Sequence, residues 1–443
     1  MIKQFQTAIQ IAVCSLVVMA IPANTLSATF VGNTYDVGDR PAGVVSVDVN
    51  GDGKPDLISA NNRANTLMVL TNSGIGGFHS NATFAVGGGP LTVIAADVNG
   101  DGKPDLISAN NLANTLTVLT NKGGGIFGSN ATLTVGSYPA FVASADVNGD
   151  GKPDLISANN GANTLTVLTN DGKGAFGSNT TLSVGSRPYC VAAADVNADG
   201  KLDLVSANYD ANTLTVLTNR GNGGFGFHVT LNVGSGPQFV VAADVNADGK
   251  LDLVSANYNA NTLTVLTNRG SGIFGFAATL AVSGYPNSMV ATDMNGDGKV
   301  DLISANLSVF PNAGTLTVLT NNGSGGFGSN TVANVGLQPF SVAAADVNGD
   351  GRLDLITANF GDNTLSVLTQ TGGPLPALTM AATSSNTVVI SWPLVASGFV
   401  LQTNANLRGT NWGTAGYRIT TNGATKSINI APAASQLFFR LEQ

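Results

Sequence analysis

The sequence predicts an all-β protein, in which a seven-bladed β-propeller is followed by a small β-sandwich. A unit of about 49 residues recurs seven times along the 443 residues, and each copy contains four short runs of strand-forming residues. Charged residues make up only 10 % of the chain and glycine occurs 55 times, which argues against a helical or disordered protein. Four strands in each period of about 40 to 50 residues are typical of propeller blades.

Residues 1–28 predict a secretory signal peptide. Lys3 precedes an apolar run from Ala8 to Ile21, and small residues follow this run. We therefore expect a secreted or cell-surface protein, and the run is too short for a transmembrane segment. Once this peptide is removed, Cys190 is the remaining cysteine, so no internal disulfide can stabilise the fold.

Residues 29–372 contain the seven units. Their first aspartates are 49 residues apart, except that the last interval is 53 because of four extra residues within Leu307–Pro311. In the second unit, apolar and threonine-rich runs predict strands at Leu91–Ala96, Asp105–Asn110, Thr115–Thr120 and Asn130–Val135. A parallel β-helix is the alternative, but its coils need far fewer residues each.

The chain ends predict how the ring closes. The seventh unit stops after Leu365–Leu368 and lacks a fourth strand, whereas Phe30–Val37 aligns with the fourth strands of the other units. We expect this first strand of the mature protein to complete the last blade, which would leave no open sheet edge.

Every unit contains the pattern D-x-N-x-D-G-x-x-D, and we call these seven segments the acidic loops. They hold 21 of the 27 acidic residues of the chain. The predicted metal ligands are Asp48, Asn50, Asp52, Asp56, Asp97, Asn99, Asp101, Asp105, Asp146, Asn148, Asp150, Asp154, Asp195, Asn197, Asp199, Asp203, Asp244, Asn246, Asp248, Asp252, Asp293, Asn295, Asp297, Asp301, Asp346, Asn348, Asp350 and Asp354.

Oxygen ligands at positions 1, 3, 5 and 9 of a flexible loop favour Ca²⁺, with up to seven ions per chain. Zn²⁺ is disfavoured because no loop contains Cys or His, and Mg²⁺ is second because it requires a stricter octahedron. The alternative is a metal-free hairpin with Asx turns. Two carboxylates about 4 Å apart repel by about 4 kcal/mol at an effective dielectric constant near 20, which favours a bound cation. Position 12 is Ser59 rather than Glu, so the loop is not an EF-hand.

The units resemble the FG-GAP or VCBS repeats of integrin α-subunit propellers and of many secreted bacterial proteins. The residues that carry the resemblance are Asp-Val-Asn-Gly-Asp-Gly-Lys-Pro-Asp-Leu, the later Phe-Gly pairs such as Phe127-Gly128, and the Gly-Ser-x-Pro that follows. The resemblance covers about residues 30–372. It implies a seven-bladed propeller with Ca²⁺ between the first and second strands of each blade, and a role in adhesion or recognition of proteins or carbohydrates.

Residues 373–443 lack the repeat and predict a small β-sandwich-like domain. Five strand-like runs are present: Thr387–Trp392, Phe399–Gln402, Tyr417–Ile419, Ser427–Ile430 and Leu437–Leu441. The Ser-Trp-Pro and Phe-Phe-Arg-Leu segments are similar to short fibronectin-type-III-like domains of secreted bacterial proteins. A spacer or anchoring module is the simplest interpretation, and a carbohydrate-binding or sorting role is the alternative.

The sequence favours a binding protein over an enzyme. The two histidines, His79 and His228, lie in different units without a distinctive acid nearby, and Cys190 reads as a buried thiol. A polysaccharide lyase or hydrolase built on the propeller is the alternative. The net charge of −8 and the lack of a basic cluster exclude nucleic acid as a partner. We expect a monomer that binds an extracellular protein or carbohydrate.

Strand alternation predicts where such a ligand binds. Turns between strands 2 and 3 share one face with the connections between blades, and on this face the units differ in sequence; we call it the connection face. Arginine and aromatic side chains, which anchor interfaces, are frequent there. The turns offer Arg63, Leu112, Tyr209, Asp210, Tyr258, Phe360 and the inserted Leu307–Pro311, and the connections offer Arg40, Tyr138, Arg187, Tyr189, Gln238, Phe239, Tyr285, Gln338 and Phe340. Among these, Arg187, Tyr209, Tyr258 and the insertion are the main candidates for ligand contacts, while Phe239 and Phe340 could equally pack between blades.

Overall fold

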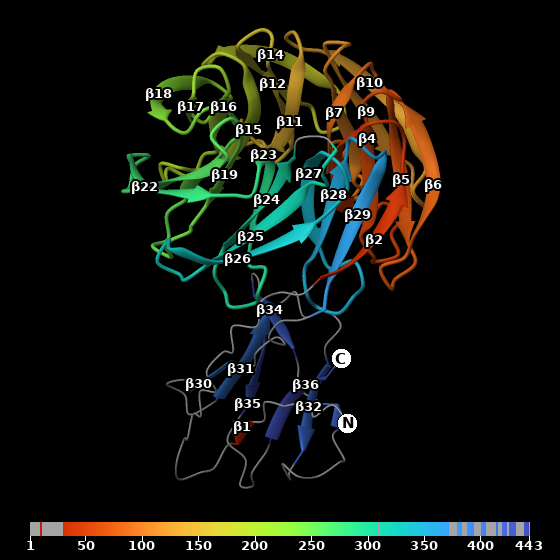
Figure 1. The fold of residues 1–443 in the computed structure, drawn as a ribbon, viewed down its shortest axis with the longest axis vertical. Helices are drawn as coiled ribbons and strands as arrows, with labels where there is room; N and C mark the ends of the chain where they lie inside the picture. Colours follow the sequence, from red (N-terminus) through yellow and green to blue (C-terminus); the bar gives the residue numbers. More distant parts are fainter. Residues whose placement is uncertain are drawn as a thin grey trace.

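Seven antiparallel sheets of four strands are arranged around a common axis in the computed structural model (Figure 1). The structure describes residues 9–10, 30–308, 311–371, 379–382, 388–393, 400–404, 413–414, 419–422, 425–430 and 438–442. No helix occurs among these residues. The prediction of an all-β, seven-bladed propeller is therefore confirmed.

Each blade runs from an innermost to an outermost strand. Blade 1 comprises β3 (Pro41–Val47), β4 (Asp56–Asn61), β5 (Thr66–Asn72) and β6 (Phe78–Ala85). Blade 2 comprises β7 (Pro90–Ala96), β8 (Asp105–Asn110), β9 (Thr115–Asn121) and β10 (Phe127–Thr134). Blade 3 comprises β11 (Pro139–Ala145), β12 (Asp154–Asn159), β13 (Thr164–Asn170) and β14 (Phe176–Ser183). Blades 4 and 5 comprise β15 (Pro188–Ala194), β16 (Asp203–Asn208), β17 (Thr213–Asn219) and β18 (Phe225–Asn232); and β19 (Pro237–Ala243), β20 (Asp252–Asn257), β21 (Thr262–Asn268) and β22 (Phe274–Ala281). Blades 6 and 7 comprise β23 (Tyr285–Thr292), β24 (Asp301–Leu307), β25 (Thr315–Asn321) and β26 (Phe327–Asn334); and β27 (Pro339–Ala345), β28 (Asp354–Asn359), β29 (Thr364–Gln370) and β2 (Phe30–Asp36).

The second strand of every blade is buried along its whole length, as in β8 with the sequence Asp-Leu-Ile-Ser-Ala-Asn. Such a strand packs against neighbouring blades on both faces, which explains why its burial does not alternate from one residue to the next. It ends in a turn whose last residue is an asparagine with a positive φ in six blades, for example Asn114 at 58°. Asparagine tolerates this left-handed conformation better than most residues, so the turn follows directly from the local sequence.

Among the described residues of the propeller, the hydrophobic core consists of seven clusters, one at each contact between adjacent blades. Between blades 2 and 3, for example, Ile107 and Leu116 pack against Val142 and Leu155, and all four are fully buried. A blade cannot bury both of its faces alone, so the stability of each blade depends on its two neighbours.

The first propeller strand closes the ring. All seven residues of β2 pair with β29, from Phe30 opposite Gln370 to Asp36 opposite Thr364. Figure 1 shows β2, in red, beside β29, in blue. The cluster between blades 7 and 1 then includes Tyr35, which stacks edge-on against Phe78 at 5.4 Å between ring centroids. The predicted closure by an N-terminal strand is confirmed.

Two local predictions need correction. The fourth strand of the second unit begins at Phe127, three residues before the predicted start, because this phenylalanine is 8 % exposed and packs into the core between blades 1 and 2. Phe-Gly therefore begins the outer strand and does not form the turn before it. In the insertion, Leu307 is 7 % exposed at the end of β24, so it does not contribute to a ligand surface; residues 309–310 lie outside the described residues.

The C-terminal segment forms β structure. One sheet contains β30 (Thr379–Ala382), β31 (Val388–Pro393), β35 (Thr425–Ile430) and β34 (Thr420–Asn422), and the other contains β1 (Ile9–Gln10), β36 (Phe438–Glu442), β32 (Val400–Asn404) and β33 (Gly413–Thr414). Trp392 is 2 % exposed, while Trp412, Tyr417 and most of the predicted signal peptide lie outside the described residues. A search of the described residues for a helix capable of crossing a membrane found none.

Candidate functional site

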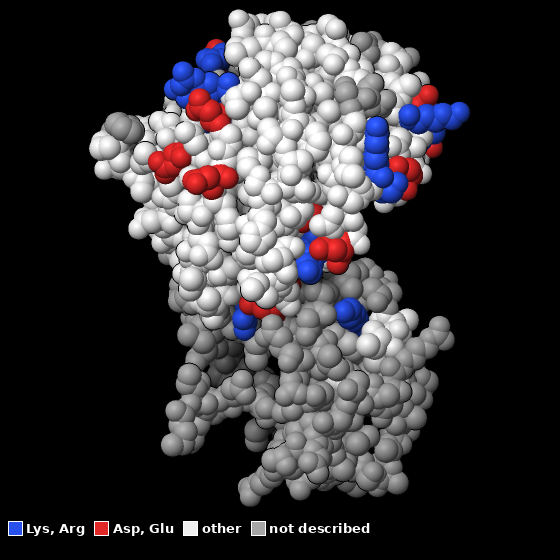
Figure 2. All heavy atoms as spheres, turned by 90° about the vertical axis from the view of Figure 1, so that its right-hand side faces the viewer, with Lys and Arg blue, Asp and Glu red and all other residues white. Residues whose placement is uncertain are grey.

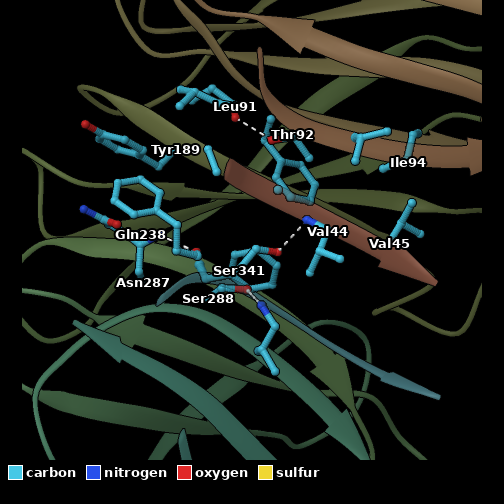
Figure 3. A pocket seen from close by; sticks show the side chains of 18 residues that line it. Val44, Val45, Leu91, Thr92, Ile94, Tyr189, Gln238, Asn287, Ser288 and Ser341 are labelled. Carbon is cyan, nitrogen blue, oxygen red and sulfur yellow. Dashed lines mark hydrogen bonds between the residues drawn. The ribbon is translucent and has the colours of Figure 1, made fainter. Parts of the chain in front are cut away.

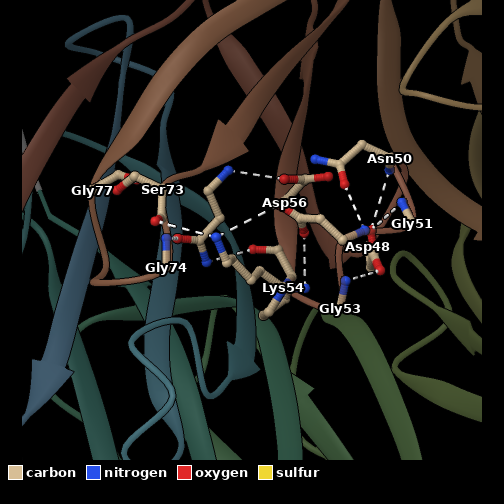
Figure 4. Close-up of polar contacts among 12 residues, drawn as sticks. Asp48, Asn50, Gly51, Gly53, Lys54, Asp56, Ser73, Gly74 and Gly77 are labelled. Carbon is tan, nitrogen blue, oxygen red and sulfur yellow. Dashed lines mark hydrogen bonds and ion pairs between the residues drawn. The ribbon is translucent and has the colours of Figure 1, made fainter.

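The acidic loops adopt one conformation, which the loop of blade 1 illustrates (Figure 4). The N–H groups of Gly51 and Gly53 each donate to the Asp48 carboxylate at 2.7 Å. The side-chain oxygen of Asn50 accepts from Asp52 N–H at 2.8 Å. Gly51 and Gly53 have φ values of 83° and 82°, which glycine adopts without a steric penalty. The loop therefore turns tightly around the carboxylate of its first residue.

The aspartate at position 9 connects the loop to the sheet. Asp56 is fully buried, and its two oxygens accept hydrogen bonds from Val49 N–H at 3.1 Å and Asn72 N–H at 2.9 Å. Burial raises the pKa of Asp56 above its usual value, the two N–H donors oppose this, and Asp52 and Asp48 raise it further. Burial has the same effect in the other blades, and it raises the pKa to about 6 for Asp301 and about 7 for Asp354. Each loop thus holds a buried carboxylate in a locally negative site.

In six of the seven blades an asparagine at the end of the third strand links the acidic loop to the preceding blade, and blade 7 has Gln370 at this position. Asn121 donates from its side chain to Val49 O at 2.9 Å, in the acidic loop of blade 1, and to Pro104 O at 3.1 Å in its own blade. Its backbone N–H donates to Asp105 at 2.8 Å. The sequence pattern does not reveal this role directly. The signal for it is an asparagine that follows position 9 at a fixed distance in most units. Equivalent bonds are made by Asn72, Asn170, Asn219, Asn268 and Asn321.

The cation at position 7 is a second feature shared by the acidic loops. A lysine, or Arg352 in blade 7, pairs with the aspartate at position 5 in all seven loops, at 3.0 to 3.8 Å. Figure 2 shows charged side chains as red and blue neighbours on a largely uncharged surface. The six lysine pairs are substantially exposed, so each contributes little to stability.

Two loops differ from the other five. Blades 4 and 5 have Ala198 and Ala247 where the others have glycine at position 4, and both alanines have a positive φ, 61° and 59°. In the other five loops the N–H at this position donates to the first aspartate at 2.7 to 2.8 Å. Within the described chain neither alanine makes that bond. These two loops are therefore locally strained.

The donor set suits a calcium ion. The carboxylates of positions 1 and 9 and the oxygens of positions 3 and 5 are hard oxygen ligands, as Ca²⁺ prefers. Their present hydrogen bonds come from backbone N–H groups and use only part of their acceptor capacity, because each carboxylate has about four acceptor sites. Among the described residues, no three acidic, cysteine or histidine side chains are already at metal-ligand spacing. An ion bound there would exchange some of these N–H bonds for metal contacts.

The connection face carries a row of four tyrosines. Blade 4 contributes Tyr189 and Tyr209, blade 5 contributes Tyr258 and blade 6 contributes Tyr285. The distance between ring centroids is 5.3 Å from Tyr189 to Tyr209, 6.3 Å from Tyr209 to Tyr258 and 5.1 Å from Tyr258 to Tyr285. We call these residues the tyrosine row; all four are partly exposed. Burial raises the pKa of Tyr258, and the neighbouring tyrosines add to this shift, so its hydroxyl is protonated at neutral pH.

Arg187 fixes one end of the tyrosine row. Its guanidinium lies over the rings of Tyr189 and Tyr209, at 5.4 and 5.1 Å from the centroids. It donates to the Tyr189 hydroxyl at 2.9 Å and pairs with Asp210 at 3.4 Å. Burial alone would lower the pKa of Arg187, but Tyr189 and Asp210 more than offset this effect. The structure therefore brings the candidates Arg187, Tyr209 and Tyr258 together.

Other candidates on this face lie apart from the tyrosine row. On blade 7, Phe340 stacks on Phe360 with 4.7 Å between ring centroids, and the Arg40 guanidinium lies over the Phe360 ring at 5.3 Å. Phe239 packs into the cores between blades and against Phe141, which supports a packing role. The remaining candidates lie on blades 1, 2, 3 and 7; they are Arg63, Leu112, Tyr138 and Gln338. Arg63 forms an ion pair with Asp39.

A cavity of about 250 Å³ opens along the axis, lined by the innermost strands of all seven blades. Tyr189, Gln238 and Asn287 lie at one end, and Val45 and Ile94 lie toward the other end (Figure 3). Tyr189 also belongs to the tyrosine row, so the cavity and the row adjoin one another. The Asn287 amide donates to Phe340 O at 2.6 Å, whereas the Gln238 side chain makes no hydrogen bond to any described residue.

Cys190 is not placed as a nucleophile. Cys190 is 1 % exposed, its thiol donates weakly to Val240 O at 3.8 Å, and burial raises its pKa to about 12. A nucleophilic cysteine instead needs a lowered pKa and access to solvent. His79 lies exposed on the outermost strand of blade 1, far in sequence from the tyrosine row. The side chain of His228 lies outside what the structure describes.

Seven four-stranded blades, closed into a ring by the first strand, make the fold a β-propeller. The acidic loop that recurs in every blade indicates which family of propellers it is. The chain belongs to the FG-GAP-like repeat family, whose model matches residues 48–108, 97–157, 146–206, 195–255, 244–304 and 293–357. A comparison with curated protein sequences found no match.

Solved structures with similar folds include the crystal structure of BBS1N in complex with ARL6DN, soaked with lead. It is 13 % identical, with a TM-score of 0.53 over 76 % of this chain and 94 % of that chain. A lectin from Agrocybe aegerita that recognises non-reducing terminal N-acetylglucosamine is 20 % identical, with a TM-score of 0.46 over 71 % of this chain and 88 % of that chain. The first similarity shows a shared fold, and the second is a loose likeness in shape.

Proposed function

We propose that this chain is a secreted or cell-surface, non-catalytic recognition protein whose propeller binds an extracellular protein or glycan through its connection face. The observation that carries the proposal is the tyrosine row held by Arg187. Four partly exposed tyrosines on three blades form a continuous surface at the mouth of the axial cavity. Tyrosine and arginine are the residue types that most often anchor binding interfaces.

Calcium has a structural role in this proposal. The ligands would be the aspartates and asparagines at positions 1, 3, 5 and 9 of each acidic loop, Asp48, Asn50, Asp52 and Asp56 in blade 1. A bound ion supplies positive charge beside carboxylates that burial and mutual repulsion leave poorly stabilised. Because Asp56 also holds the ends of two strands together, the ion would stabilise the blade as well as the loop.

Secretion rests on the signal-peptide pattern of residues 1–28, and absence of catalysis rests on the buried, high-pKa thiol and the isolated histidine. A propeller-based polysaccharide lyase or hydrolase is the second candidate. No observation on the described residues favours it.

The test compares binding by the wild-type protein and by a Tyr209→Ala/Tyr258→Ala double variant. A pull-down from the secreted fraction and a glycan array are run with both proteins, with Tyr138→Ala as the control. Tyr138 is 52 % exposed on the connection face of blade 3, outside the tyrosine row. We expect the double variant to lose binding and the control to keep it. Unchanged binding by a correctly folded double variant would place the site elsewhere, and turnover of any polysaccharide would favour the enzyme.

A further inference from the structure

We infer that the ligand of the connection face is a neutral oligosaccharide, whose terminal sugar enters the mouth of the axial cavity while the following sugars stack on the tyrosine row. This inference depends on the proposed function and specifies the chemistry of its ligand. It rests on the charge of the surface, the character of its side chains, the size of the cavity and the sequence of one connection.

The surface is electrically balanced. Arg187 and Asp210 are the charged side chains in contact with the tyrosine row, and they neutralise each other at 3.4 Å. Tyr258 stays uncharged at neutral pH because burial raises its pKa. An acidic ligand would have to displace Asp210 from Arg187, and a cationic ligand would have to displace Arg187 from Asp210. The two side chains are 42 % and 48 % exposed, so the pair itself adds little stability, but its charges cancel. The surface therefore offers no net electrostatic attraction to a charged ligand and favours a neutral one.

The side chains are amphipathic, as a sugar requires. A sugar ring has an apolar face of C–H groups and an edge of hydroxyl groups. Each tyrosine offers an aromatic ring together with a hydroxyl group that donates and accepts hydrogen bonds. The Tyr209 hydroxyl donates to Asn259 Oδ1 at 3.1 Å, which places an amide beside the ring. A purely apolar partner would leave these polar groups unsatisfied.

The cavity mouth suits one sugar ring and not a larger group. The whole axial cavity, of about 250 Å³, lies below the roughly 300 to 1,000 Å³ of pockets that enclose whole small ligands. At its polar end, the amide of Gln238 has no partner among the described residues, and Asn287 engages Phe340 O through its Nδ2 alone. These amides can bind the hydroxyl groups of a terminal sugar, while Tyr189 connects that sugar to the tyrosine row.

The sequence of one connection makes room for the row. Gly236 occupies the position where other connections have Arg40, Tyr138, Arg187, Tyr285 or Gln338, and it shares glycine with the connection into blade 2, at Gly89. A Cβ atom added at Gly236 would lie 2.5 Å from Asn259 Nδ2 and 3.1 Å from Tyr209 Cε2. A side chain there would have to displace the Asn259 amide or the Tyr209 ring, which are hydrogen-bonded to each other. The same glycine has a φ of 69°, so the backbone also favours it.

The experiment measures binding of the full-length mature protein to soluble neutral glucan, xylan and mannan oligosaccharides of one to five sugars, with polygalacturonate oligosaccharides as the acidic arm. Isothermal titration gives the affinities, and ultraviolet difference spectra report directly on tyrosine stacking. We expect at least one neutral series to bind, with affinity rising up to three or four sugars. We expect Tyr258→Ala and Gln238→Ala each to weaken binding by about tenfold or more.

Two further variants keep the test decisive. Tyr209→Phe retains the ring and removes the hydroxyl group, so it should fold normally and weaken binding by a smaller factor than Tyr258→Ala. Tyr138→Ala should bind as the wild-type protein does. Binding of the acidic series alone, or neutral binding that none of the tyrosine-row variants weakens, would overturn the inference. If the connection face captured a protein in a manner sensitive to Tyr209→Ala/Tyr258→Ala while no neutral glycan bound, this inference would fail and the proposed recognition function would stand.

Discussion

The asparagine that links successive blades should be one of the largest single contributors to propeller stability. In blade 3, Asn170 is 3 % exposed and donates from its side chain to Val98 O of blade 2 at 2.9 Å and to Pro153 O at 3.0 Å. Its Oδ1 accepts from Gly172 N–H at 2.9 Å. Asn170→Ala removes all three bonds and leaves the carbonyl group of the fully buried Val98 without this donor.

A buried polar group that loses its partner costs about 1–3 kcal/mol. The two carbonyl groups dominate here, because Gly172 is more exposed and water can replace its bond. We therefore expect Asn170→Ala to lower the free energy of unfolding by about 3 kcal/mol. Asn170→Asp should cost at least as much, because it removes both donors and places a second carboxylate close to Asp154, which already accepts from Asn170 N–H at 2.8 Å.

The assay is urea denaturation followed by far-ultraviolet circular dichroism and by tyrosine absorbance. Coincident transitions from the two signals and an unchanged slope are required before the midpoint is converted into a free energy. The matched control is Asn222→Ala in the exposed turn of blade 4, where one bond from Gly224 N–H at 3.1 Å is lost. We expect the control to change stability by less than about 0.5 kcal/mol. A loss below about 1 kcal/mol for Asn170→Ala would refute the argument that this residue holds adjacent blades together.

Four further outcomes follow from the same structure. Removal of calcium by a chelator should lower the melting temperature strongly, since an ion that binds only the folded state stabilises it by mass action, and superimposable melting curves would contradict the calcium proposal. A truncation that begins after Arg40 removes β2, leaves β29 as an open edge and should aggregate in light scattering; a monomer of unchanged thermal stability would disprove this. Cys190, whose pKa burial raises to about 12, should be protonated at pH 8 and resist thiol reagents until the protein unfolds, and rapid labelling of the native protein would show the thiol to be accessible. Ala198→Gly and Ala247→Gly should each raise the free energy of unfolding by about 1 kcal/mol, because glycine adopts the positive φ without strain, and a loss of stability on denaturation would show that the alanines are not strained.

The fold was predictable because each blade repeats the same local sequence pattern. Residues close together in the sequence determine the buried run Asp-Leu-Ile-Ser-Ala-Asn and the turn asparagines. Simple alignment of the units shows that the first strand of the chain supplies the fourth strand that the seventh unit lacks. The start of the outer strand at Phe127 was not predictable in this way, because that phenylalanine packs against the neighbouring blade and only the assembled ring shows it.

The candidate site was predictable in composition and only partly in arrangement. Strand alternation placed Arg187, Tyr209 and Tyr258 on one face, as the structure has them. Their contacts with one another depend on the angle between blades and on the small size of Gly236, neither of which a linear pattern encodes. The role of Asn170 was missed because its bond reaches a carbonyl group 72 residues away, in another repeat.

The pairing of β2 with β29 also determines how the ring responds to mechanical load. The two strands are antiparallel, and Phe30 and Gln370 are partners at the same end of the pair. A force that pulls apart the segments before Phe30 and after Gln370 therefore acts on one residue pair at a time, as in unzipping, and never on all seven pairs together. Blade 7 is thus the point at which tension between the two ends of the chain would open the ring, whereas the tyrosines on blades 4, 5 and 6 lie away from that path.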